Sequence, residues 1–135
     1  MNDFRCPNCQ GILNLDNRIV FLAEDKQKQK GLIFLSPELG NYTVSKQDLL
    51  NIEPGDRIGV FCPLCHTDLL AVPEKNLARI EMIEDDELYS VLFSVKCGEK
   101  STYMFKGMKL KEHFGKHSNP NIDFQSLFAF GGGMM

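Results

Sequence analysis

The sequence predicts a mainly β protein of the small α+β class, with antiparallel hairpins and a meander around a four-cysteine site. Two observations lead to this prediction. Short runs rich in β-branched and aromatic residues recur along the chain between turn-forming residues, a pattern typical of antiparallel strands. Four of the five cysteines fall in two matching clusters, Cys6-Pro7-Asn8-Cys9 and Cys62-Pro63-Leu64-Cys65.

The segment between the two cysteine clusters predicts a hairpin followed by a short helical turn. Residues 18–23 (RIVFLA) and 31–35 (GLIFL) read as strands joined by the polar stretch 24–30. Residues 45–48 (SKQD) carry a helix-start pattern, so a single helical turn is expected after them. Residues 57–61 (RIGVF) then read as a strand that leads into the second cluster.

The second half of the chain predicts a β-meander. Three strand-like runs, 77–83, 88–97 and 101–105, are joined by short polar connections, which favour antiparallel neighbours. Beyond them, 109–117 is basic and is expected to be helical or irregular. The expected organisation is a β domain over 1–107, with 15–57 as an insert between the cysteine clusters and 77–105 as the meander, and a C-terminal extension over 108–135.

The two Cys-Pro-x-Cys clusters indicate a metal site. Each cluster places two sulfurs on one side of a tight turn, and the proline presets the backbone of that turn. Four thiolates are a standard ligand set for one structural zinc ion, so Cys6, Cys9, Cys62 and Cys65 are the expected ligands. Closing a loop of about 55 residues costs on the order of 4 kcal/mol. Structural zinc contributes on the order of 10–16 kcal/mol, so one shared site is favoured.

The clusters resemble those of the zinc-ribbon class, whose members present CPxC-type knuckles from two β-hairpins. The resemblance covers residues 4–13 and 60–70, and it implies zinc ligation without implying an activity. Rubredoxins, which bind iron, use similar knuckles, in which glycine typically follows the second cysteine. Gln10 and His66 stand at those positions here, which favours zinc over iron. An iron–sulfur cluster, or two incomplete sites, would use the same cysteines.

Composition narrows the remaining function classes. No apolar run approaches the roughly 20 residues of a membrane span, and the first residues lack the pattern of a secretory signal. With paired CxxC clusters, this predicts a cytoplasmic protein without disulfides. The formal net charge of −3 disfavours generic nucleic-acid binding. No catalytic constellation is evident, and four thiolates leave no open metal position, so the chain is not expected to be an enzyme.

Several other residues are candidate sites. Cys97 lies between Lys96 and Lys100 but is expected to be an inert thiol. His113 and His117 would share one face of a helix, although a solvated basic segment is the expected state. Glycine-rich residues 131–133 do not form a phosphate loop. The aromatic tail is expected to pack on its own sheet or to dock on a partner through Phe124, Leu127, Phe128 and Phe130.

The expected function is that of a small zinc-stabilised interaction or adaptor protein, with a protein partner or self-association and without a membrane. The first alternative is a metal–thiolate redox carrier or an accessory subunit of an enzyme complex. The second is a nucleic-acid-binding adaptor that uses the basic region 96–117, where six lysines interleave with aromatic residues.

Overall fold

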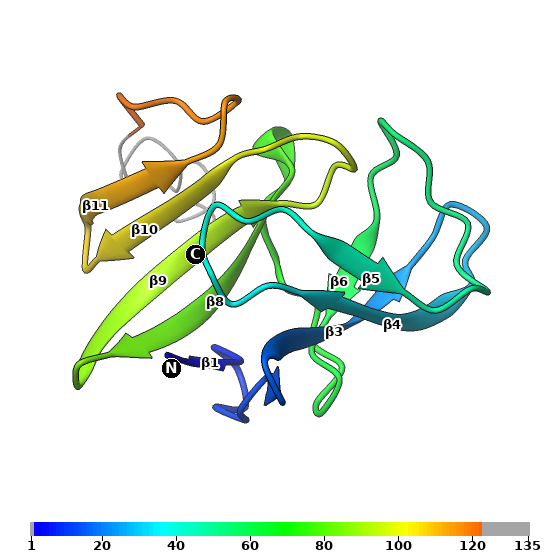
Figure 1. Ribbon diagram of the computed structural model, residues 1–135, viewed down its shortest axis with the longest axis horizontal. Coiled ribbons are helices and arrows are strands. Elements are labelled where there is room, and N and C mark those ends of the chain that lie inside the picture. The colour runs from blue at the N-terminus through cyan, green and yellow to red at the C-terminus, as the bar shows by residue number, and fades with distance from the viewer. Residues whose placement is uncertain (1, 123–135) are drawn as a thin grey trace, which may run out of the picture.

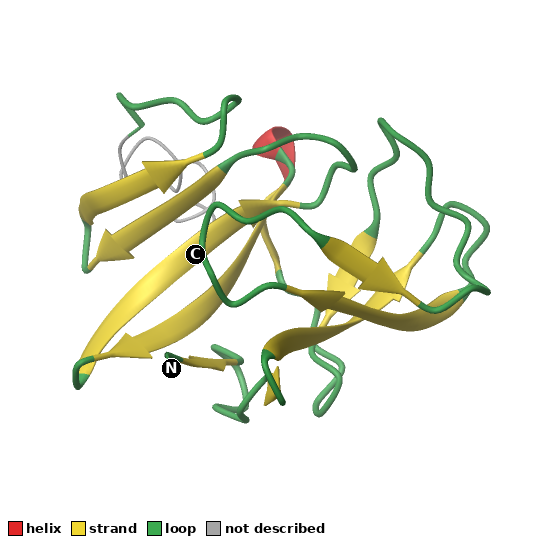
Figure 2. Cartoon of the chain, in the orientation of Figure 1, coloured by secondary structure: helices red, strands yellow, loops and turns green. Residues whose placement is uncertain are grey.

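The computed structural model describes residues 2–122 as two antiparallel β-sheets that share one core (Figures 1 and 2). Sheet A contains β1 (Asp3–Arg5), β7 (Leu70–Val72), β8 (Leu77–Glu84), β9 (Glu87–Ser94), β10 (Thr102–Lys106) and β11 (Lys109–Phe114). Sheet B contains β2 (Asn14–Leu15), β3 (Arg18–Glu24), β4 (Lys30–Leu35), β5 (Val44–Lys46) and β6 (Gly59–Phe61). The mainly β fold predicted from the sequence is confirmed. Between residues 2 and 122, no helix has the length and apolar character that a membrane span requires.

The predicted meander forms most of sheet A. Strands β8, β9, β10 and β11 are neighbours in chain order, and β8 pairs with β9 along its whole length. Asp85 and Asp86 have φ values of 52° and 64°, as a two-residue hairpin turn of the favoured twist requires. In β9, the adjacent residues Val91 and Leu92 are both buried. Because neighbouring side chains on a strand point to opposite faces, this central strand is covered on both sides.

The predicted hairpin of residues 18–35 forms the centre of sheet B. Strand β3 pairs with β4 from Ile19 opposite Leu35 to Glu24 opposite Lys30. Strands β2 and β6 both pair with β3 on its other side, at opposite ends. The two sheets meet at a shared core, where the rings of Phe21 on β3 and Phe93 on β9 lie 5.4 Å apart between centroids.

Two local expectations were wrong, for a common physical reason. The helix-start pattern at residues 45–48 does not begin a helix, because Val44–Lys46 forms β5 and pairs with β4. After it the chain closes only one tight turn, in which the Leu50 amide donates to the Gln47 carbonyl at 3.1 Å. After β5, the Gln47 amide donates a hydrogen bond to the Leu32 carbonyl at 3.1 Å, and the Gln47 Oε1 atom accepts one from the Leu32 amide at 2.8 Å. The basic segment beyond residue 107 is strand β11, which pairs with β10, and not a helix. In both places pairing with a neighbouring strand outweighs local propensity.

Asp25 organises the tip of the β3–β4 hairpin. Its Oδ1 accepts hydrogen bonds from the amides of Gln27 and Gln29, both at 2.9 Å, and its Oδ2 accepts one from the Asn51 amide at 2.8 Å. The hydrogen bond from the Asn51 amide is the main reason that the pKa of this carboxyl lies below its ordinary value. The two hydrogen bonds from within the hairpin lower the pKa further. Asp25 is 4% exposed, so the loop around Asn51 depends on this side chain for a partner.

We predict that Asp25→Asn lowers the unfolding temperature by several degrees at neutral pH, because an amide turns a donor toward one of these N–H groups. Since the folded-state pKa is depressed, the stabilisation is fully present above the ordinary aspartate pKa of about 3.9. It is lost as pH falls through the lower folded-state pKa. Thermal melts between about pH 5 and pH 2 should show the gap between wild type and variant narrowing. A constant gap would contradict this role.

Candidate metal centre

The two cysteine clusters lie where the chain crosses between the sheets. The first cluster joins β1 of sheet A to β2 of sheet B, and the second joins β6 of sheet B to β7 of sheet A. The four ligand atoms of Cys6, Cys9, Cys62 and Cys65 all lie within 4.8 Å of one another. The predicted single four-cysteine cluster is therefore confirmed, and it connects both crossings of the chain.

The two clusters are built as matching knuckles. In the first, the Cys6 amide donates to the Gly11 carbonyl and the Gln10 amide donates to the Cys6 carbonyl. In the second, the Cys62 amide donates to the Thr67 carbonyl and the His66 amide donates to the Cys62 carbonyl. The two bonds measure 3.0 and 2.9 Å in each knuckle. Each knuckle is closed by an antiparallel bridge, from Arg5 to Ile12 and from Phe61 to Asp68. This hairpin-borne arrangement fits the resemblance to a zinc ribbon.

The spacing of the sulfurs fits a tetrahedral metal ion. The Sγ atoms of Cys6 and Cys65 are 3.8 Å apart, and those of Cys9 and Cys62 are also 3.8 Å apart. A metal–sulfur bond of about 2.3 Å gives a tetrahedron whose edge is 1.63 times longer, or about 3.8 Å. All four cysteines have free thiols, and no disulfide competes for them. The site can therefore hold a metal, and tetrahedral thiolate coordination suits zinc or iron.

Backbone amides point at the buried sulfur of each knuckle. Cys6 Sγ accepts from the amides of Asn8 and Cys9 at 3.3 and 3.5 Å. Cys62 Sγ likewise accepts from Leu64 and Cys65 at 3.3 and 3.4 Å. These donors stabilise the negative charge of a thiolate ligand.

The residue after each second cysteine adopts the left-handed turn although neither is glycine. Gln10 and His66 have φ values of 64° and 66°. The Gly11 amide donates to Cys9 Sγ at 3.4 Å. A knuckle with glycine directly after the second cysteine would form the same amide–sulfur hydrogen bond. The absence of glycine at these two positions therefore does not separate zinc from iron.

Burial and hydrogen bonds give the thiols of the metal-free site different pKa values. Burial raises the pKa of the Cys6 thiol to about 12, whereas Cys65 is exposed and its pKa is lowered to about 6. The main cause at Cys65 is the side-chain amide of Asn8, 3.5 Å away on the other knuckle, followed by the Thr67 amide. A bound divalent ion would hold all four sulfurs as thiolates, so metal binding releases the protons of those thiols that are still protonated, Cys6 above all.

The other candidate residues lie apart from this cluster. His113 Nδ1 lies 2.8 Å from the Ser118 hydroxyl, and His117 Nδ1 accepts from the Lys100 amide at 2.8 Å. The paired-histidine hypothesis assumed a helix, but His113 lies on strand β11. Within residues 2–122, only the four cysteines form a group of three or more metal-binding side chains. The tail residues Phe124, Leu127, Phe128 and Phe130 lie outside the described residues.

A cavity between the sheets is a candidate site that the sequence did not predict. It measures about 470 Å³, and Tyr42, Cys97 and Lys100 are among the residues that line it. Its lining comes from segments far apart in the chain, so no local motif signals it. No family model matches this chain, and no curated protein or solved structure shows significant similarity to it.

Proposed function

We propose that this protein is a small interaction module in which one structural zinc ion locks the two sheets together. The position of the four thiolates at both crossings between the sheets carries this proposal. Four protein ligands fill a tetrahedral shell and leave no position for water or substrate, so the metal shapes the protein and does not act as a catalyst.

Exposed apolar side chains on both knuckles support a role in binding a protein partner. Leu64 on the second knuckle is 60% exposed, and Ile12 beside the first is 52% exposed. Leu64 lies against the first knuckle, because a Cβ added to Gly11 would sit 2.3 Å from its Cδ1 atom. The metal thus fixes an apolar surface that spans both knuckles, which we call the knuckle surface. Apolar anchors at the centre of a contact supply much of the energy of protein–protein binding.

We predict that Leu64→Glu abolishes recovery of the partner when the tagged protein is used for affinity capture from its host. A buried glutamate without a counter-charge costs several kcal/mol at such a contact, enough to weaken binding at least a hundredfold. Leu88→Glu is the matched control, because Leu88 is 46% exposed on β9, beyond the β8–β9 turn. Leu88→Glu should keep the wild-type melting temperature, and metal analysis should find Leu64→Glu as fully metal-loaded as wild type, so that loss of the partner reports on the surface. Equal recovery of the partner by Leu64→Glu and wild type would contradict a role for the knuckle surface.

A redox carrier or an accessory redox subunit is the second candidate, and the amide–sulfur hydrogen bonds favour it. Such bonds to metal-bound sulfur tune the potential of iron–thiolate centres. An absorption spectrum with metal analysis separates the two candidates. One zinc per chain and no visible bands support the interaction module. One iron per chain with thiolate-to-iron absorption would replace it with the redox carrier.

A further inference from the structure

The cavity between the sheets has the size and lining of a small-molecule site. Its volume of about 470 Å³ falls within the range of roughly 300–1,000 Å³ that is usual for ligand pockets. The apolar lining comes from both sheets and includes Phe21, Ile33 and Val60 of sheet B with Val91 and Phe93 of sheet A. Such a lining favours an apolar ligand.

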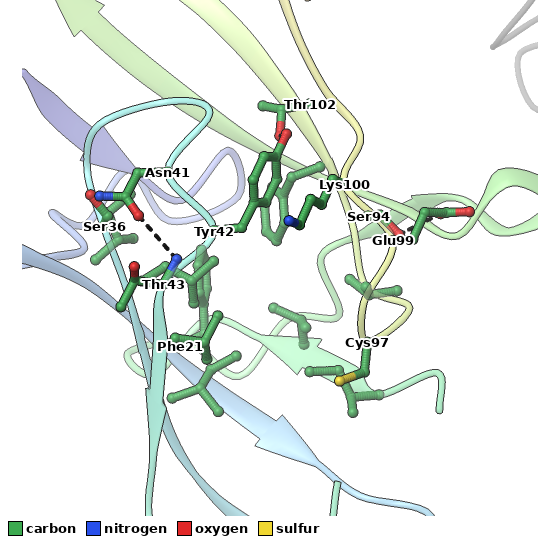
Figure 3. Close-up of a pocket in the computed structure, with 18 of the residues that line it drawn as sticks. Phe21, Ser36, Asn41, Tyr42, Thr43, Ser94, Cys97, Glu99, Lys100 and Thr102 are labelled. Atoms are coloured by element: carbon green, nitrogen blue, oxygen red, sulfur yellow. Dashed lines mark hydrogen bonds between the residues drawn. The ribbon is translucent and has the colours of Figure 1, made fainter. Parts of the chain in front are cut away.

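Two hydrogen-bonded closures hold the cavity walls in place. On one side, the Tyr42 hydroxyl lies 2.8 Å from the Thr102 hydroxyl, which ties the β4–β5 loop to β10 (Figure 3). On the other side, the segment before β6 pairs with residues 95–97, directly after β9. The Ile58 amide donates to Val95 and the Cys97 amide donates to Asp56, at 3.0 and 2.7 Å. The walls are therefore preorganised for a ligand.

The polar rim has an excess of positive charge. Lys96 and Lys100 line the cavity, and neither forms an ion pair with any residue between 2 and 122. Figure 3 shows the Lys100 side chain reaching toward Tyr42. The Glu99 carboxylate accepts a hydrogen bond from the Ser94 hydroxyl at 2.5 Å, and the third lysine of the lining, Lys46, donates to the Leu50 carbonyl. Glu38 is the other acidic residue of the lining, on the opposite loop.

We propose that the cavity binds a free medium-chain carboxylate, with its apolar chain between the sheets and its head group at Lys96 and Lys100. An apolar chain matches the lining, and one anionic group matches the two ammonium groups without ion-pair partners. This site is separate from the knuckle surface, so the two proposals stand or fall independently.

Calorimetric titration of the full metal-loaded chain with decanoate, below its micelle concentration, tests the proposal. One saturable site is expected. Affinity should fall roughly fifteenfold from decanoate to octanoate, because the two chains differ by two methylenes and each buried methylene contributes about a fourfold gain in affinity. Decanol should bind more weakly than decanoate, and decyltrimethylammonium should not bind. No saturable decanoate binding, or equal binding of the cationic amphiphile, would overturn the proposal.

Charge-removing variants locate the head group. The double variant Lys96→Gln/Lys100→Gln should weaken decanoate binding roughly tenfold while leaving decanol binding unchanged. The matched control is Lys109→Gln/Lys111→Gln, which removes two exposed lysines of β11 that do not line the cavity. Equal weakening of decanoate binding by both double variants would place the ligand elsewhere and overturn the site.

Discussion

Removal of the bound metal is expected to lower the thermal unfolding midpoint by roughly 15 °C. A ligand present at a thousand times its dissociation constant stabilises the folded state by about 4 kcal/mol. For a chain of 135 residues, each kcal/mol shifts the midpoint by about 4 °C. The effect is expected to be large because a metal at the four cysteines would join both places where the chain passes between the sheets. Thermal melts by circular dichroism, with and without excess chelator in a reducing buffer, measure it.

Substitutions of cysteine provide the controls for this prediction. Cys62→Ser removes a buried ligand and should reproduce the chelator effect, and added zinc should not rescue it. Cys97→Ser alters the fifth cysteine, which is not part of the cluster, and should melt within about 2 °C of wild type. A wild-type midpoint that does not respond to the chelator would show that the sheets hold together without the metal.

Gly115→Ala is expected to destabilise the protein by at least about 3 kcal/mol. Gly115 follows β11 with a φ of +92°, a conformation that strains any residue with a side chain. A Cβ at this position would also lie 2.3 Å from the Lys100 carbonyl oxygen and 2.5 Å from the Tyr42 hydroxyl. The added methyl must therefore displace backbone, as well as the loop that closes the cavity. Urea denaturation of wild type and variant measures the loss.

Gly98→Ala separates backbone strain from the close contact. Gly98 has a φ of +90°, nearly the same as Gly115, but a Cβ there would meet nothing within 4 Å. Gly98→Ala should lower the free energy of unfolding by about 1–2 kcal/mol, from backbone strain alone. The difference between the two variants, at least about 1–2 kcal/mol, is the contribution of the contact with Lys100 and Tyr42. Equal losses for the two variants would contradict that contact.

The sequence allowed the strands of the hairpins and the four-cysteine cluster to be predicted, because their signals are local. The β3–β4 hairpin and the meander follow from apolar runs separated by polar turns. The cluster of Cys6, Cys9, Cys62 and Cys65 follows from the number and spacing of the cysteines. Local signals failed at Ser45, where a helix-start pattern lies in a strand, because pairing with β4 decides the conformation.

The arrangement of the two sheets depends on contacts between distant residues and could not be predicted in this way. Strand β1 belongs to sheet A because Phe4 pairs with Met82, 78 residues away. The next strand, β2, pairs instead with β3 in sheet B. The position of the knuckles at the crossings follows from these two pairings, and so does the cavity between the sheets. The residues around the cysteines contain no sequence pattern that predicts either pairing.

Amide hydrogen exchange with and without the metal tests most directly whether the metal holds the crossings together. The Leu13 amide donates to Phe4 at 2.7 Å behind the first knuckle, and the Leu69 amide donates to Val60 at 2.9 Å behind the second. When the metal is removed, these two amides should lose at least as much protection from exchange as the amides between β9 and β10 lose. Unchanged protection at Leu13 and Leu69 after metal removal would contradict the claim that the metal locks the two sheets.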